Sequence, residues 1–350
     1  MDISGDLISD RIVVKKASDI GRLYNKSHIG TLLPSNLLEL NLLEGVFLLD
    51  EGKMVLHQQR KQIPFSKLLK LAVQQIPEFE TKYLVYKDLR NRGHAITQVD
   101  DATTISFRKV KQKNEVTPSC VIAAYSERDF LDIEVTKQLI QRYAQTNTAL
   151  WYALVDEEGD LTYYDIASVD LRGDILEQRY PHGTAVLLQN RLIVFDKKLS
   201  TQLLQKEFFG KPFGETLQLS FVEALYLLEK DVLEIQTTDG NTLSLEKCVH
   251  LMQKQQPDIL QRLRVFQDLK QRGLLVKTGF KFGAHFRAYS THPESTHAEY
   301  LIHVVEKGFR SIWAEISRAV RLAHSVNKEF IFACIDGYTI DYVRFGRLRP

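Results

Sequence analysis

The sequence has few cysteines and no long hydrophobic run. The three cysteines lie at positions 120, 248 and 334, and they form no Cys-x-x-Cys motif. An odd number of widely spaced cysteines argues against a disulfide framework and against a cysteine-based zinc site. No apolar run approaches the ~20 residues that a membrane helix needs, and the first residues lack the basic and apolar regions of a signal peptide. We therefore expect a reduced, cytoplasmic protein with no membrane partner.

Composition is that of an ordinary globular protein. Hydrophobic residues make up 44% of the sequence and charged residues 26%, so sizeable cores can form. The formal net charge is only +2, which by itself indicates neither a nucleic-acid partner nor its absence. A chain of 350 residues is too long for one ordinary domain and fits about two to four.

Several segments of the first half recur in the second half in the same order. Residues 87–93 (KDLRNRG) resemble residues 267–273 (QDLKQRG), so position 87 corresponds to position 267. The same offset relates 147–156 to 327–336 and 23–30 to 203–210, and an offset one position shorter relates 42–49 to 221–228. The chain is therefore predicted to contain two copies of one unit, joined near residues 172–174. Two copies are too few for a solenoid, so we expect two similarly folded halves.

Hydrophobic periodicity predicts the same plan in both copies. Leucines at helical spacing in residues 36–50, behind Ser35 and Asn36, predict a helix, and the apolar run 148–155 predicts a strand buried on both faces. Each copy is predicted to be an α+β N-terminal subdomain followed by an α/β subdomain with a mixed sheet. The predicted subdomains are residues 1–81, 82–173, 174–259 and 260–350.

The two copies differ in charge. Residues 262–350 contain 15 Lys and Arg against 8 Asp and Glu, a net of +7, whereas the matching residues 82–170 contain 11 against 14, a net of −3. A positive surface favours phosphate and a negative one opposes it. The second copy is therefore the better candidate for contact with nucleic acid.

Three reactive residue types stand at the ends of predicted elements in the second copy. Tyr289 and His297 flank a short loop, and Lys328 directly precedes a predicted buried strand. RNA is cleaved by its own 2′-hydroxyl when a base, an acid and a positive charge near the phosphorus are supplied together. Histidine suits proton transfer near neutral pH, whereas a tyrosine needs nearby cations to act as a base. A base, an acid and a cation are the set needed to cut RNA without a metal, so these three side chains are candidates for that chemistry.

Each of the three has an ordinary structural explanation when it is taken alone. A tyrosine at a strand end usually packs, a loop histidine is usually solvated, and a lysine at a helix end is favoured by the helix dipole. The first copy provides a comparison, because its equivalent positions are Lys109 or Val110, Thr117 or Pro118, and Thr148. All three groups are missing there together while neighbouring residues persist, and packing roles give no reason for that joint loss.

The second half resembles the catalytic unit of the archaeal tRNA-splicing endonucleases. The matching segments are residues 226–229 (YLLE), 266–273 (FQDLKQRG), 278–289 (TGFKFGAHFRAY), 297–304 (HAEYLIHV) and 318–328 (RAVRLAHSVNK). The tandem arrangement is similar to the homodimeric members, in which each chain joins a degenerate copy to an active one. The resemblance therefore implies that the α/β subdomain of each copy is nuclease-like. The resemblance implies cleavage of precursor tRNA at bulge–helix–bulge exon–intron junctions, leaving 2′,3′-cyclic phosphate and 5′-hydroxyl ends, with no metal or other cofactor.

The same resemblance implies roles for single residues. Tyr289 is implied to be the general base and His297 the general acid, with His292 as an alternative acid because the intervening loop is short. Lys328 is implied to stabilise the transition-state charge. The family also uses two arginines that sandwich a bulge base across the dimer. Arg321 matches the first and Arg344 is our choice for the second, with Arg347 as the alternative.

The acidic turn 156–160 has two interpretations. By resemblance, Asp156, Glu157, Glu158 and Asp160 match a loop that docks into a basic groove of the partner chain. The −3 and +7 windows make such pairing in a homodimer electrostatically sensible. Without the resemblance, this would be an ordinary solvated turn.

Two other functions remain as alternatives. Five of the ten histidines (285, 292, 297, 303 and 324) lie within forty residues, which suggests a metal-dependent nuclease. Their spacing matches no zinc helix motif and no carboxylate cluster accompanies them, so no metal ligand is predicted. The second alternative is a non-catalytic RNA-binding subunit, which the complete Tyr–His–Lys set argues against. We expect precursor tRNA as the partner, and not DNA.

Overall fold

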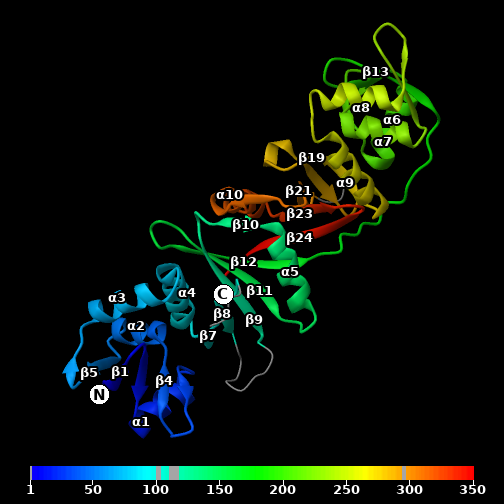
Figure 1. The fold of residues 1–350 in the computed structure, drawn as a ribbon. Helices are drawn as coiled ribbons and strands as arrows, with labels where there is room; N and C mark the ends of the chain where they lie inside the picture. The colour runs from blue at the N-terminus through cyan, green and yellow to red at the C-terminus, as the bar shows by residue number, and fades with distance from the viewer. Residues whose placement is uncertain (1, 100–103, 110–117, 294–296) are drawn as a thin grey trace.

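The chain forms an elongated molecule with four pieces in sequence order (Figure 1). The computed structural model describes residues 2–99, 104–109, 118–293 and 297–350. The N-terminal pieces of the two repeats lie at opposite ends, and the two nuclease-like pieces lie side by side between them. Within the described part of the chain, no helix combines the length and the apolar composition of a membrane span.

The first N-terminal subdomain is a six-stranded sheet with helices. Its elements are β1 (Ile3–Ile8), β2 (Arg11–Val14), α1 (Ala17–Ile20), the π-helix η1 (Gly21–Lys26), β3 (Thr31–Leu32), β4 (Leu38–Leu40), α2 (Leu42–Asp50), β5 (Met54–Gln58), β6 (Lys61–Gln62) and α3 (Phe65–Gln75). The strand order is β3-β4-β2-β1-β5-β6, and β1 pairs with β5 in parallel.

The second N-terminal subdomain repeats this arrangement. Its elements are β13 (Gly183–Leu187), β14 (Leu192–Val194), α6 (Lys197–Glu207), β15 (Lys211–Phe213), β16 (Thr216–Leu219), α7 (Phe221–Glu229), β17 (Leu233–Gln236), β18 (Thr242–Leu243) and α8 (Leu245–Gln253). The strand order β15-β16-β14-β13-β17-β18 corresponds strand for strand to that of the first subdomain.

A shared capping arrangement shows why the two copies fold alike. Helix α2 begins after Asn41, which forms a capping box with Glu44, and α7 begins after Ser220, which forms one with Glu223. Each glutamate also accepts a bond from a glycine amide, Gly30 or Gly210, at 2.9 Å.

The helix predicted from residue 36 is shorter than expected and begins at Leu42, because residues 38–40 form β4, which pairs with β2.

The two nuclease-like subdomains contain matching elements at the offset that relates the repeats. The first has α4 (Phe79–Asn91), β7 (Ile96–Gln98), β8 (Phe107–Lys109), β9 (Cys120–Ser126), β10 (Phe130–Asp132), α5 (Ile133–Ala144), β11 (Ala149–Val155) and β12 (Leu161–Ser168). The second has α9 (Ile259–Gln271), β19 (Leu275–Thr278), the 3-10 helix η2 (Phe280–Phe282), β20 (Phe286–Tyr289), β21 (Tyr300–Glu306), β22 (Arg310–Ile312), α10 (Trp313–Ser325), β23 (Glu329–Asp336) and β24 (Thr339–Leu348). Helices α4 and α9 cross the predicted boundaries at 81/82 and 259/260.

One sheet of ten strands joins the two nuclease-like subdomains. Its order is β19-β20-β21-β23-β24-β12-β11-β9-β8-β7, and antiparallel pairing of β12 with β24 connects the repeats. Strands β9 and β11 are parallel, as are β21 and β23, so the sheet is mixed as predicted. Strands β10 and β22 form a separate two-stranded sheet, again between the repeats. The predicted tandem architecture is confirmed.

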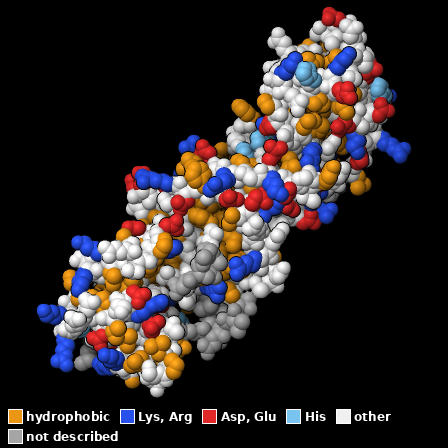
Figure 2. Space-filling model, viewed as in Figure 1, with side chains coloured by type: hydrophobic (Ala, Val, Ile, Leu, Met, Phe, Trp, Pro, Cys, Tyr) orange, Lys and Arg blue, Asp and Glu red, His pale blue; other side chains and the backbone are white. Residues whose placement is uncertain are grey.

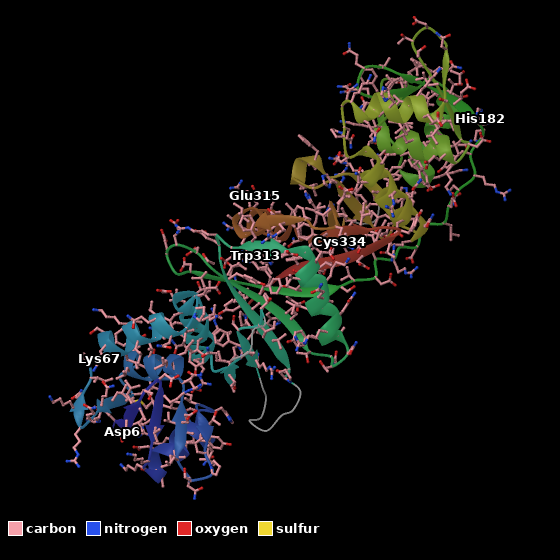
Figure 3. The ribbon with its side chains drawn as sticks, viewed as in Figure 1. Asp6, Lys67, His182, Trp313, Glu315 and Cys334 are labelled. Atoms are coloured by element: carbon pink, nitrogen blue, oxygen red, sulfur yellow. The ribbon has the colours of Figure 1, made fainter. Side chains whose placement is uncertain are left out.

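A shared core fixes the two nuclease-like subdomains against each other. Trp313, labelled in Figure 3, is fully buried at the start of α10. Its ring lies 5.6 Å from that of Tyr152 and 6.2 Å from that of Tyr164, both in the first repeat. Phe345 of its own repeat lies 6.3 Å away. The repeats therefore share one hydrophobic core and are not merely linked by the chain.

Candidate active site

The ends of three strands meet at one edge of the large sheet. Strand β20 is antiparallel to β21, with Ala288 opposite Tyr300, and β21 is parallel to β23, with Tyr300 opposite Glu329. The end of β20 therefore lies beside the starts of β21 and β23. Tyr289 ends β20, Lys328 directly precedes β23, and His297 lies three residues before β21.

Tyr289 is the last residue of β20 and is buried at 6% exposure. It forms a small hydrophobic cluster with Ala298 and with Leu275, its pairing partner on β19. The guanidinium carbon of Arg287 lies 5.9 Å from the centre of the Tyr289 ring. Packing on one side and a cation on the other hold the ring at this edge of the sheet.

Lys328 lies between α10 and β23, where its backbone N–H donates to Ala323 O at 2.9 Å. Its ammonium group donates to Ala298 O at 2.9 Å. Burial, and then the positive charges of Arg287 and Lys281, hold the pKa of Lys328 below its usual value. A cation surrounded by other cations favours an anionic group at this position.

Ala298 is the point at which the three candidates meet. Its side chain contacts the cluster of Tyr289, its carbonyl accepts from Lys328, and its covalent neighbour is His297. His297 is exposed, which suits a group that must reach a substrate. Residues 294–296, in the loop between Tyr289 and His297, lie outside the described residues.

The first copy preserves the backbone of this edge without the reactive groups. Thr148 Oγ1 donates to Pro118 O at 3.0 Å, which is the counterpart in this copy of the bond from Lys328 to Ala298. Lys109 ends β8 where Tyr289 ends β20, and its ammonium lies 4.8 Å over the ring of Trp151. Thr117, one of the two positions equivalent to His297, lies outside the described residues.

A contact from the second N-terminal subdomain was not anticipated from the sequence. Phe208 follows α6 with a left-handed backbone, φ 57°, and its ring lies 6.2 Å from that of Tyr289. The same ring lies 6.3 Å from His292, whose Nε2 is 3.0 Å from Gln205 O. These contacts connect separate subdomains, so no local sequence pattern could have indicated them.

The candidate arginines differ in their surroundings. Arg344 is half-buried and forms ion pairs with Asp165 and, at 3.6 Å, with Glu329. Arg321 and Arg347 are both exposed. Burial raises the pKa of the Tyr164 hydroxyl, and the nearby guanidiniums of Arg347 and Arg321 oppose that rise. Arg347 lies opposite Tyr164 in the pairing of β12 with β24, whereas Arg344 is engaged by two carboxylates.

Comparison with known proteins finds the same tandem order along the chain. The sequence model described as "tRNA intron endonuclease, catalytic C-terminal domain" matches residues 79–163 and 259–342. The model described as "tRNA intron endonuclease, N-terminal domain" matches residues 3–69 and 183–249. The chain belongs to the tRNA intron endonuclease family.

Relatives in this family align along the whole length. The protein named tRNA-splicing endonuclease of Methanococcoides burtonii is 34% identical over 98% of this chain and 99% of its own. The one of Methanosarcina mazei is 31% identical over 98% of each chain. A shorter relative of that name, from Methanopyrus kandleri, is 35% identical over 41% of this chain and 84% of its own. The resemblance predicted from the sequence motifs is confirmed.

The acidic turn of this tRNA intron endonuclease family member is an ordered, exposed connection between β11 and β12. Asp156 accepts bonds from the backbone N–H groups of Glu158 and Asp160, at 3.0 and 2.9 Å. Glu157 pairs with Arg128. All four acidic residues are exposed, so the turn presents negative charge to solvent.

The five clustered histidines do not gather at one site, and only His285 and His303 are seen in contact with each other among the described residues. His285 and His303 stack with ring centres 4.3 Å apart, and His285 Nδ1 accepts from Val304 N. His324 and His297 are exposed on different elements. In the described parts of the chain, no three His, Cys, Asp or Glu side chains are grouped so that they could hold a metal ion.

Proposed function

We propose that this protein removes introns from precursor tRNA by cutting at bulge–helix–bulge junctions. The chain supplies its own acid–base groups, and the products are 2′,3′-cyclic phosphate and 5′-hydroxyl ends. The observation that carries the proposal is the convergence of Tyr289, His297 and Lys328 around Ala298 at one sheet edge. Membership of the tRNA intron endonuclease family supports the choice of substrate.

Each side chain has a place in this reaction. Tyr289 takes the proton of the 2′-hydroxyl as that oxygen attacks the adjacent phosphorus, and His297 gives a proton to the departing 5′-oxygen. Lys328 stabilises the charge on the non-bridging oxygens, with its ammonium fixed by Ala298 O at 2.9 Å. Arg287 and Lys281, whose charges lower the pKa of Lys328, add positive potential at the same point.

The proposal extends to a homodimer in which each chain supplies one active site. The acidic turn 156–160 of one chain docks against a basic surface of its partner, because opposite charges steer and hold the two surfaces. Arg321 and a second arginine hold an unpaired bulge base in the partner's site by stacking. Arg347 suits this second role better than Arg344, since Arg344 would first have to leave Asp165 and Glu329.

The test is cleavage of a precursor tRNA with a bulge–helix–bulge junction by purified protein in EDTA. We expect full activity and cyclic phosphate at the new 3′ end, identified by its resistance to phosphatase before acid treatment. Loss of cleavage in EDTA that returns with a divalent metal would contradict the proposal and support a metal-dependent nuclease. Intact binding with no cleavage by wild-type protein would support a non-catalytic RNA-binding subunit.

A further inference from the structure

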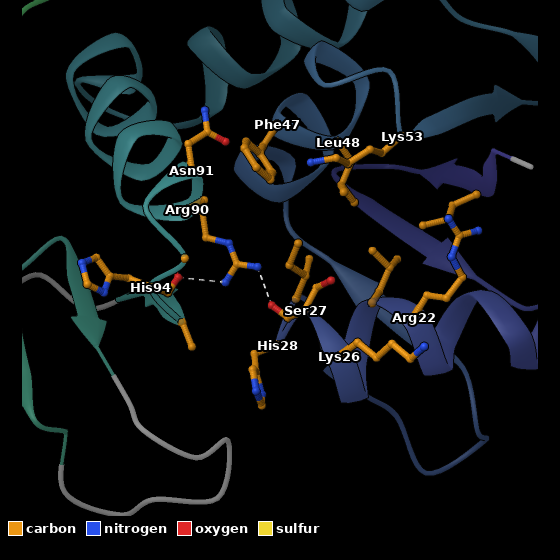
Figure 4. Close-up of a pocket in the computed structure, with 15 residues that line it drawn as sticks. Arg22, Lys26, Ser27, His28, Phe47, Leu48, Lys53, Arg90, Asn91 and His94 are labelled. Carbon is orange, nitrogen blue, oxygen red and sulfur yellow. Dashed lines mark hydrogen bonds between the residues drawn. The ribbon is translucent and has the colours of Figure 1, made fainter.

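A basic pocket lies between the first N-terminal subdomain and α4, far along the chain from Tyr289. Its volume is about 450 Å³, within the range of ligand-binding sites. Figure 4 shows Arg90 reaching from α4 towards Ser27, with Lys26, Arg22 and Lys53 on the opposite side. None of the described residues that line the pocket is Asp or Glu. The lining therefore contributes positive charge and no carboxylate.

The second repeat shows how the cation equivalent to Arg90 is neutralised there. There, Lys270 stands at the position equivalent to Arg90 and pairs with Glu207 at 2.6 Å, with both side chains under 5% exposed. Glu207 also accepts bonds from Gln178 N and Tyr180 Oη, at 3.0 Å each. In that copy a carboxylate neutralises the buried cation, and the segment that includes residues 178–180 donates hydrogen bonds to that carboxylate.

In the first repeat the carboxylate has become Ser27 while the cation remains. Arg90 donates to Ser27 O and to His94 O, and its Nε is buried with no partner among the described residues. His28 Nδ1 is likewise buried with no partner in that part of the chain. Arg90 is half-buried, and its guanidinium reaches two carbonyl oxygens but forms no ion pair with a carboxylate among the described residues. A positive charge with no opposite charge beside it suits an anionic ligand.

The exposure and charge of the pocket's lining residues favour a phosphate group of a nucleic-acid backbone over a base. The apolar lining residues Leu23, Phe47 and Leu48 are at most 4% exposed, so the Phe47 ring offers a base no accessible face for stacking. Lys26 and Arg22 are exposed at the rim, where an extended polyanion can reach them. Lys and Arg are mixed with Asp and Glu over the face seen in Figure 2, so attraction depends on local clusters such as this one.

We infer that this pocket, lined by Lys26, Arg90 and their neighbours, binds a backbone phosphate of the precursor RNA. The inference rests on the proposed function for its ligand, and it adds a contact in the non-catalytic repeat. Phosphate contacts position an RNA without reading its sequence. The pocket thus gives the degenerate repeat a role in holding the substrate, separate from its place in the shared core.

Two variants and one control test the inference. Lys26→Gln removes a rim cation, and Ser27→Glu restores the carboxylate that Glu207 supplies in the second repeat. Lys206→Gln is the matched control, since Lys206 occupies the position equivalent to Lys26 in the other subdomain. Binding of a precursor tRNA with a 2′-deoxy group at each cleavage site is measured as a function of salt.

Both pocket variants are expected to bind RNA several-fold more weakly, with the slope of log affinity against log salt reduced by about 1, while the control keeps both. Unchanged RNA affinity in both folded variants overturns the inference. Thermal unfolding of the same proteins is also measured with and without inorganic phosphate. If phosphate stabilises wild type but not the two pocket variants, while all three bind RNA equally well, the ligand is a small free anion and the RNA assignment is overturned. Failure of wild-type protein to cut RNA that it binds refutes the proposed function alone.

Discussion

Lys328→Thr is the most informative substitution at the candidate active site. The first repeat carries Thr148 at this position, and Thr148 Oγ1 donates to Pro118 O at 3.0 Å as Lys328 Nζ donates to Ala298 O at 2.9 Å. The variant therefore keeps a donor for this carbonyl in a backbone that already accommodates threonine. The substitution removes the ammonium charge, together with its contact to the Phe282 ring at 5.8 Å.

The expected loss follows from that charge. Removing one preorganised group that stabilises transition-state charge costs about 10²- to 10³-fold in rate, or about 2.7–4 kcal/mol. The free energy of unfolding should change by less than about 1 kcal/mol, because the carbonyl of Ala298 keeps a donor. RNA affinity should fall little, since one cation of several is lost.

The assay is single-turnover cleavage of precursor tRNA with enzyme in excess, together with urea unfolding. Thr148→Lys is the reciprocal control and should create no new cleavage, because the first repeat lacks the tyrosine that ends β20. A folded Lys328→Thr protein that cleaves within about threefold of the wild-type rate would refute the assigned role. A large loss of cleavage that is accounted for by unfolding of the variant would also refute this role.

Three further predictions concern stability. Burial and then His303 lower the pKa of His285 to about 3. The unfolded chain therefore binds the proton more tightly, and stability falls as pH drops below about 6.5, by about 2 kcal/mol at pH 5. His285→Asn should flatten this dependence in urea titrations at several pH values, whereas substitution of the exposed His324 should not. Trp313→Ala should cost about 3–5 kcal/mol in urea unfolding, because this fully buried ring joins the repeats; a loss under about 1 kcal/mol would contradict the shared core. Lys270→Met should cost about 3–5 kcal/mol by leaving Glu207 unpaired, and adding Glu207→Leu should recover part of that loss; equal instability of the double variant would count against the pairing.

Local patterns predicted the elements well where one signal dominated. The apolar run 148–155 is strand β11, found at residues 149–155, and the duplicated segments became matching elements at a constant offset along the chain. The helix expected from residue 36 begins instead at Leu42. Pairing of residues 38–40 with β2 outweighs the helical spacing of those leucines, since only the tertiary fold supplies a partner strand.

The candidate site was predictable in its residue types but not in its geometry. The end of one strand and the starts of two others are local positions, so Tyr289, His297 and Lys328 could be identified from the chain alone. Their meeting at Ala298 depends on the pairing of β20, β21 and β23. The carboxylates that engage Arg344 come from β12 and β23, so sequence spacing could not distinguish it from Arg347.

The amino-acid sequence by itself determined the duplication, the order of the subdomains and the reactive side chains, because each depends on residue identity at fixed spacing. Tertiary structure alone decided how the repeats join, through β12 and β24 and the core around Trp313. It also decided that Phe208 reaches Tyr289 and that Arg90 lacks the carboxylate that balances Lys270. These are contacts between distant segments, whose energies depend on packing and burial that no local pattern contains.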